Sequence, residues 1–159
     1  MACNGGYLNR VWSYLTNTGT VSDGCDPYVS GNRYVPSCPA KCSSTSQLFT
    51  KYKCASGSVV HPTSVAAIQT EIMNNGPVQA GFTVYSDFYN YRSGIYKHTT
   101  GYVLGGHAVK VIGWGTQSGI NYWIIANSWG PSWGEKGFFR IQMGQCGIEA
   151  QVYSCRAQV

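Results

Sequence analysis

GGHAV at residues 105–109 and ANSWG at residues 126–130 are the two stretches that decide how this sequence folds. Each adjoins an apolar run typical of a strand. A buried asparagine is costly unless its amide is hydrogen-bonded, and the oxygen of Asn127 is suited to accept from the imidazole of His107. Such a bond fixes the imidazole tautomer and aims the other ring nitrogen at a reacting group. The pair therefore predicts the base and the orienter of a nucleophile–base–orienter site, with Trp129 covering it from water.

The composition indicates a globular chain with an unusual surface. Its 159 residues are 43% hydrophobic and 14% aromatic, enough to bury a core of single-domain size. Only 11% are charged, whereas glycine (20) and tyrosine (12) are abundant. This balance is typical of a loop-rich protein with a polar, uncharged surface, as extracellular and vesicular proteins have.

The charge and the apolar pattern exclude two classes of partner. The net charge is +5, but the basic residues are scattered and form no run or RNA-binding signature, so we expect no nucleic acid. No apolar run approaches the length of a membrane span, so we expect no membrane partner.

The seven cysteines favour disulfides in an oxidising compartment. A zinc site is disfavoured because no second cysteine pair follows Cys38 and Cys42 at a suitable spacing, and the histidines lie elsewhere in the sequence. We expect no metal. The start of the chain has neither a charged leader nor an apolar signal core. We therefore expect that a signal has been removed or that the native N-terminus lies elsewhere.

Two helices are predicted by apolar periodicity and by end signals. The first runs from Leu8 to Leu15, with apolar residues at helical spacing, and ends before Gly19. Residues 21–60 are rich in cysteine, proline, serine and glycine and predict loops held by disulfides. The second helix follows them, with Thr63 or Ser64 as its N-cap and Gly76-Pro77 as its stop.

Four strands are predicted after the second helix. Apolar residues alternate with the others from Val78 to Tyr85, which is the pattern of a half-buried strand. Further strands are expected at Ala108–Trp114, Tyr122–Ala126 and Phe138–Gln142, separated by glycine-rich turns. Together they suggest an antiparallel sheet or a small barrel.

The sequence resembles the papain-like cysteine peptidases, and within them the cathepsin B-like branch. The resemblance spans nearly the whole chain in collinear order. Its pieces are CNGGY (3–7), NGPV (75–78), VYSDF (84–88), SGIY (93–96), GGHAV (105–109), GWG (113–115), ANSWG (126–130), WGEKGFF (133–139) and CGIE (146–149).

The resemblance implies an α+β fold of the papain type in which one part is truncated. We expect residues 1–60 to be a remnant of the helical, disulfide-looped left domain. Residues 61–150 are expected to form a complete antiparallel β-barrel, the right domain, which carries His107 and Asn127. Residues 151–159 are expected to return toward the left domain.

The resemblance also implies a mechanism and shows a gap. A thiolate attacks the peptide carbonyl, His107 protonates the leaving amine, and water hydrolyses the thioester; no cofactor is implied. In such enzymes the histidine follows the nucleophilic cysteine by roughly 130 to 150 residues. A cysteine that far ahead of His107 would precede Met1. We therefore expect the nucleophile and the oxyanion glutamine to be missing and this chain to be inactive alone. An N-terminal fragment of the same protein is the expected partner, beside a peptide or protein substrate.

The resemblance implies disulfides Cys25–Cys42 and Cys54–Cys155, and it leaves Cys146 a buried thiol. The partners of Cys3 and Cys38 stay open. They could be free, pair with each other, or link to a separate N-terminal piece. The implied location is lysosomal, vacuolar or secreted.

The resemblance also places substrate-binding residues. Gly6 offers its backbone to the substrate, Gly81 and Gly106 shape the S2 pocket, and Trp129 forms part of S1′. Gln151 stands where the branch often has an acid at the base of S2, so apolar or polar P2 side chains are expected. Residues 26–37 are too short for the dipeptidase loop of cathepsin B and carry no histidine, so endopeptidase behaviour is expected.

Two classes of function fit these features. The first is a cysteine-type endopeptidase, represented here by its C-terminal portion. The alternative is a non-catalytic homologue whose barrel and aromatic groove bind a peptide, a glycan or a protein. A thiol-reactive epoxide separates them, because it labels one cysteine of an active enzyme.

Overall fold

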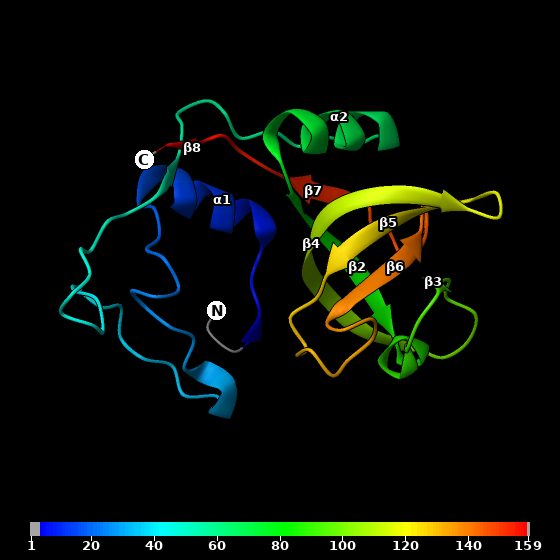
Figure 1. The fold of residues 1–159 in the computed structure, drawn as a ribbon, viewed down its shortest axis with the longest axis horizontal. Helices are drawn as coiled ribbons and strands as arrows, with labels where there is room; N and C mark the ends of the chain where they lie inside the picture. The colour runs from blue at the N-terminus through cyan, green and yellow to red at the C-terminus, as the bar shows by residue number, and fades with distance from the viewer. Residues whose placement is uncertain (1–3, 159) are drawn as a thin grey trace. The chain divides into compact units, whose positions relative to one another are not determined.

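The structure, a computed structural model, describes residues 4–158 and divides into two units. The first unit contains the described residues up to Val59 together with those from Cys155 onward, and the second contains Val60–Ser154. Figure 1 traces the chain through both units. Cys3, whose partner the sequence leaves open, lies outside the described residues.

The described residues of the first unit form one α-helix, one 3-10 helix, a short two-stranded sheet and long loops. Helix α1 spans Leu8–Asn17, as the apolar periodicity predicts. No residue of α1 is fully buried, and Val11 on its apolar stripe remains 43% exposed. Strand β1, Lys53–Cys54, pairs antiparallel with β8, Ala157–Gln158, so the C-terminal segment belongs to this unit.

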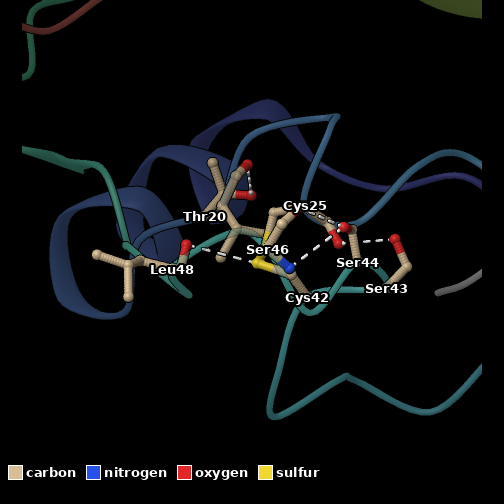
Figure 2. The surroundings of a disulfide bond; sticks show 8 residues. Thr20, Cys25, Cys42, Ser43, Ser44, Ser46 and Leu48 are labelled. Atoms are coloured by element: carbon tan, nitrogen blue, oxygen red, sulfur yellow. Dashed lines mark hydrogen bonds between the residues drawn. A yellow bond between two sulfur atoms is a disulfide. The ribbon is translucent and has the colours of Figure 1, made fainter.

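Two disulfides tie this unit together. Cys25–Cys42 closes the loop region that contains the 3-10 helix η2, Ser30–Asn32. Figure 2 shows its surroundings, in which Ser43 donates from its backbone N–H, at 2.9 Å, and from its hydroxyl, at 3.2 Å, to the carbonyl of Cys25. Cys54–Cys155 joins residues 101 positions apart, beside the β1–β8 pair. These are the two pairs that the family resemblance implies.

Helix α2, Val65–Asn75, opens the second unit where the end signals predict it. Ser64 is the N-cap, and its hydroxyl accepts a hydrogen bond from the backbone N–H of Ala67 at 3.2 Å. The helix ends at Gly76, whose φ of +93° suits glycine far better than an L side chain. The helix contacts β2 and β4, and its Ile68 is fully buried.

A six-stranded sheet forms the rest of the second unit, in the order β3-β6-β5-β4-β2-β7. The four predicted strands are confirmed as β2 (Val78–Tyr85), β4 (Val103–Gln117), β5 (Ile120–Ala126) and β6 (Phe138–Gln142). β4 is much longer than its apolar alternation indicates, because its first residues are glycine-rich and exposed. Two short strands, β3 (Ile95–Tyr96) and β7 (Gln151–Tyr153), and the 3-10 helix η3 (Ser86–Asn90) complete the unit.

The expectation of a complete antiparallel β-barrel is wrong. The sheet of the described residues is open, and β3 pairs with β6 in parallel, whereas its other pairs are antiparallel. A barrel closes when its two edge strands pair with each other along a staggered register. Here the edge strands are two and three residues long, and they pair with β6 and β2 instead. The α+β class and the mostly antiparallel pairing hold.

The core of the second unit lies between the sheet and α2 and continues into an aromatic cluster. In β2 the alternation is visible directly, since Val78, Ala80, Phe82 and Val84 are buried. The largest fully buried side chains include Trp123, Phe88 and Phe139, which anchor the aromatic part. Within the described part of the chain, no helix is long and apolar enough to cross a membrane.

Candidate functional site

His107 lies in the exposed first half of β4, opposite Phe82 of β2. Its ring is half-buried and lies 5.9 Å from the Phe82 ring, between centroids. Gly105 and Gly106 precede it and carry no side chains to cover it. One side of the imidazole is thus packed on the core.

Asn127 directly follows β5 and meets the histidine side chain. Its backbone N–H donates to the carbonyl of Gly137 at 2.9 Å, which fixes the chain where it leaves the sheet. β4 and β5 are adjacent, with Lys110 opposite Ala126, so the two functional residues lie near the same part of the sheet. The distance from His107 Nε2 to Asn127 Oδ1 is 2.8 Å.

The backbone N–H of Ser128 shows which group donates the proton in the hydrogen bond between His107 and Asn127. Its N–H can only donate, and it lies 2.8 Å from the same side-chain atom of Asn127, which must therefore be the oxygen. Because that atom can only accept, His107 Nε2 carries the proton. The other ring nitrogen, Nδ1, is then the basic one in the neutral imidazole. The geometry thus assigns both the amide orientation and the tautomer.

Trp129 covers the His107 ring on one side. The indole stacks on the His107 ring at a centroid distance of 5.1 Å and an interplanar angle of 26°. It also makes edge contacts with Phe88, at 5.4 Å, and Trp133, at 5.0 Å. Asn127 Nδ2 and Trp133 Nε1 are both buried and have no hydrogen-bond partner among the described residues. The amide nitrogen of Asn127 is therefore shielded from the surface.

The residues expected at the substrate pocket are in part brought together. Gly81 of β2 is flanked by Gln151 of β7 on one side and by Ala108 of β4 on the other. Gly106 lies opposite Thr83, two positions along β2. Gln151, Gly81 and Ala108 thus form a strip across three neighbouring strands, and the third of these strands, β4, also carries His107. Gly6 belongs to the first unit, where it is exposed just before α1.

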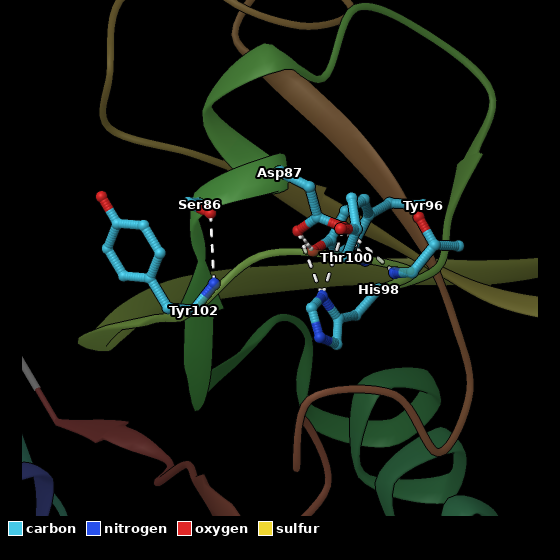
Figure 3. A network of polar contacts seen from close by, with 7 residues as sticks. Ser86, Asp87, Tyr96, His98, Thr100 and Tyr102 are labelled. Carbon is cyan, nitrogen blue, oxygen red and sulfur yellow. Dashed lines mark hydrogen bonds and ion pairs between the residues drawn. The ribbon is translucent and has the colours of Figure 1, made fainter.

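A second polar cluster, centred on Asp87, was not predicted as a functional group (Figure 3). Its carboxylate accepts hydrogen bonds from the Tyr96 hydroxyl, at 2.7 Å, and from the backbone N–H groups of Thr99 and Thr100. His98 Nδ1 lies 3.2 Å from it. Burial acts to raise the pKa of Asp87, but these hydrogen bonds outweigh it and lower the pKa to about 2. The cluster anchors the loop that leads into β4.

The described residues contain two free cysteines. Cys38 is exposed in the first unit. Cys146, the thiol of the second unit, is half-buried near Tyr96 and Asp87; burial, together with the negative charge of Asp87, raises its pKa to about 11. A thiol with a raised pKa is a poor nucleophile at neutral pH. The described residues contain no group of three or more side chains suited to hold a metal ion.

Sequence reasoning missed the Ser128 contact and the packing around Trp129. The Ser128 contact involves a backbone N–H, for which a sequence has no signal. Tyr89 stacks flat on Trp129. Asp87 lies in the VYSDF motif and just after an alternating strand, which was the available signal for a polar group at a strand end.

Comparisons with known proteins cover nearly the whole chain, including His107 and Asn127. The model of the family described as "Papain family cysteine protease" matches residues 1–156. Cathepsin B-like CP3 of Giardia intestinalis is 51% identical over 96% of this chain and 52% of its own length. The gut-specific cysteine proteinase of Caenorhabditis elegans is 47% identical over 99% of this chain and 53% of its own length.

The solved structures show the same partial coverage. Procathepsin B S9 from Trypanosoma congolense superimposes with a TM-score of 0.86 at 34% identity, covering 98% of this chain and 55% of that one. This chain therefore spans about half the length of the relatives it matches.

Proposed function

Because this chain belongs to the papain family of cysteine proteases, we propose that it is the C-terminal portion of a cysteine endopeptidase and supplies the base and the orienter of the active site. The observation that carries the proposal is the 2.8 Å hydrogen bond from His107 Nε2 to Asn127 Oδ1. In this proposal the sulfur nucleophile belongs to polypeptide outside these residues.

The assigned tautomer gives each group one task. Nδ1 of His107 accepts the proton of the thiol, and the thiolate then attacks the peptide carbonyl carbon. The imidazolium returns that proton to the leaving amine as the C–N bond breaks. Water, deprotonated by Nδ1, next hydrolyses the thioester and frees the thiol. Throughout, Asn127 accepts from Nε2–H and keeps Nδ1 directed at the reaction, while Trp129 limits access of water to the pair and contributes to S1′.

The substrate pocket follows from the strip beside Gly81. We propose that Gly81 and Gly106 leave room for a P2 side chain and that Gln151 meets its end. A neutral amide hydrogen-bonds a polar group but does not pair with arginine as a carboxylate does, so apolar or polar P2 residues are favoured. Gly6 supplies backbone groups to the substrate strand.

The mode of cleavage and the location are part of the same proposal. Residues 26–37 contain no histidine that would hold a substrate's C-terminal carboxylate, so we propose internal cleavage rather than release of dipeptides. The two disulfides suit a lysosomal, vacuolar or secreted protease. A companion N-terminal portion is the proposed partner.

The experiment uses this chain alone and in a chimera. The purified chain is expected not to cleave a fluorogenic peptide and not to be labelled by a thiol-reactive epoxide. A chimera that joins the N-terminal part of Cathepsin B-like CP3 to this chain is expected to cleave the peptide and to take the label on one sulfur of the CP3 part.

Two variants of the chimera test the assigned base. His107→Ala should lower kcat/KM by about 10²- to 10⁴-fold, the usual contribution of a general acid–base group. His61→Ala is the matched control, because His61 is exposed and contacts only the Tyr153 ring edge-on among the described residues. Epoxide-sensitive hydrolysis by the chain alone, or a chimera that is indifferent to His107→Ala, contradicts the proposal.

A further inference from the structure

Tyr89, at the exposed end of η3, makes a flat contact with the residue that covers the catalytic pair. The centroids of the Tyr89 and Trp129 rings are 4.9 Å apart, and their planes differ by 13°. Trp129 in turn stacks on His107 with an angle of 26°. Tyr89 nevertheless stays 57% exposed, so it is not held there as part of the core.

We propose that Tyr89 is a positioning residue: its ring holds the Trp129 indole against His107 and thereby keeps the His107–Asn127 hydrogen bond closed to water. This proposal rests on the proposed function, in which that hydrogen bond aims the base. Tyr89 touches neither the imidazole nor the amide among its described contacts and acts through Trp129.

The other contacts of Trp129 do not fix the tilt of its ring. Phe88 and Trp133 meet the indole at 63° and 75°, as edge-type contacts. Contacts of this kind resist sliding of the ring, but they resist a tilt of its plane less than a parallel ring does. The two nearly parallel contacts, with Tyr89 and His107, therefore control the tilt. Of these, Tyr89 is the one that does not belong to the catalytic pair.

A tilt of the Trp129 ring matters because the amide nitrogen of Asn127 is buried and unpaired among the described residues. An unpaired buried N–H group carries a free-energy cost. Water that entered under the indole would relieve that cost. It would also compete for Oδ1 and favour rotation of the amide away from His107. A tightly seated Trp129 prevents this exchange.

The ring of Tyr89, and not its hydroxyl, carries the effect. No hydrogen bond of the Tyr89 hydroxyl exists among the described residues, whereas the ring contact is nearly parallel. The proposal therefore predicts that phenylalanine replaces Tyr89 without loss and that alanine does not. A role in holding a polar partner through the hydroxyl would give the opposite result.

The test follows the imidazole proton in the 159-residue chain itself. Nitrogen-resolved NMR of the histidine rings reports the tautomer of His107 and the exchange of its Nε2 proton with water. Tyr89→Ala is expected to speed this exchange about two- to tenfold, the range that corresponds to loss of one aromatic pair. Tyr89→Phe should match the unchanged chain.

Tyr102→Ala is the matched control. Tyr102 is another tyrosine of the same unit, 71% exposed, and its side chain has no described partner. It should leave the exchange unchanged. Circular dichroism of each variant verifies that the unit remains folded, so a faster exchange in Tyr89→Ala reports the local cover and not general unfolding.

Two results would overturn the inference: exchange in Tyr89→Ala equal to that of the unchanged chain, or equal acceleration in Tyr89→Ala and Tyr102→Ala. Neither result bears on the chimera experiment, which tests the peptidase activity through His107. Conversely, an inactive chimera together with faster exchange in Tyr89→Ala would remove the proposed function and leave the packing role of Tyr89 in place.

Discussion

His107 and Asn127 are 20 positions apart in the sequence, and their side chains meet at 2.8 Å, one from the first half of β4 and the other directly after β5. The backbone N–H of Ser128 donates to the same oxygen. The backbone N–H of Ser128 and the imidazole thus orient the amide together. An asparagine suits the position because its oxygen accepts two donors while the group remains uncharged.

Removal of the Asn127 amide should release the His107 tautomer. In Asn127→Ala, Nε2–H loses its acceptor, so the neutral ring should populate both tautomers, as free imidazole does. The ring nitrogen shifts of His107 measure this directly, with His61 and His98 in the same spectrum as internal references. A ring that stays in the Nε2–H form in Asn127→Ala would show that another group orients it.

Asp87→Asn should make the chain less stable at neutral pH and should change its acid sensitivity. The folded-state pKa of Asp87, about 2, lies below its ordinary value of 3.8. Its stabilising contribution is therefore complete above about pH 4. As the pH falls toward 2, the unfolded chain takes up the proton first, so the contribution is lost.

The measurement is urea unfolding at several pH values. At pH 7 the variant should lose about 1–2 kcal/mol, after allowance for solvent screening, and the difference from the unchanged chain should vanish near pH 2. Asp23→Asn, at an exposed site without a described partner, should behave as the unchanged chain at all pH values. A difference for Asp87→Asn that persists undiminished at pH 2 would refute the assigned sign.

The two disulfides should contribute unequally. A cross-link removes more freedom from the unfolded chain when the loop it closes is longer. The sequence separations are 101 for Cys54–Cys155 and 17 for Cys25–Cys42. Removing the longer link with paired alanines should cost about 4–5 kcal/mol, against about 3 kcal/mol for the shorter one. Denaturant unfolding of the two double variants gives the comparison, and an equal or reversed order would count against this account.

Gly134 should tolerate alanine less well than Gly130, although both have a positive φ, of +57° and +90°. A Cβ at Gly134 would lie 2.6 Å from the carbonyl oxygen of Phe138 and 3.2 Å from the Tyr91 ring, whereas a Cβ at Gly130 meets open space. The φ of Gly134 lies in the left-handed region that L residues can reach and that of Gly130 lies beyond it, so a larger loss at Gly134 reports the clash, roughly 1–3 kcal/mol. Thermal unfolding of the two variants measures it, and equal losses of stability would exclude the clash.

The local elements were predictable because their signals are local. Ser64 and Gly76 mark the ends of α2 by the hydrogen bonds and backbone angles that helix termini require. The alternation from Val78 marks β2 because one face of that strand is buried. The short edge strands β3 and β7 carry too few residues for such a pattern. Barrel closure was predicted wrongly, because the pairing of sheet edges has no sequence signal.

By itself, the sequence determined that a histidine and an asparagine stand at the ends of apolar strands, within motifs of the papain family. Only the tertiary structure decided which nitrogen of His107 carries the proton and that Tyr89 lies flat on the Trp129 indole. The reason is physical. Strand pattern depends on neighbours along the chain, whereas a tautomer and a ring stack depend on donors and faces that distant segments bring together.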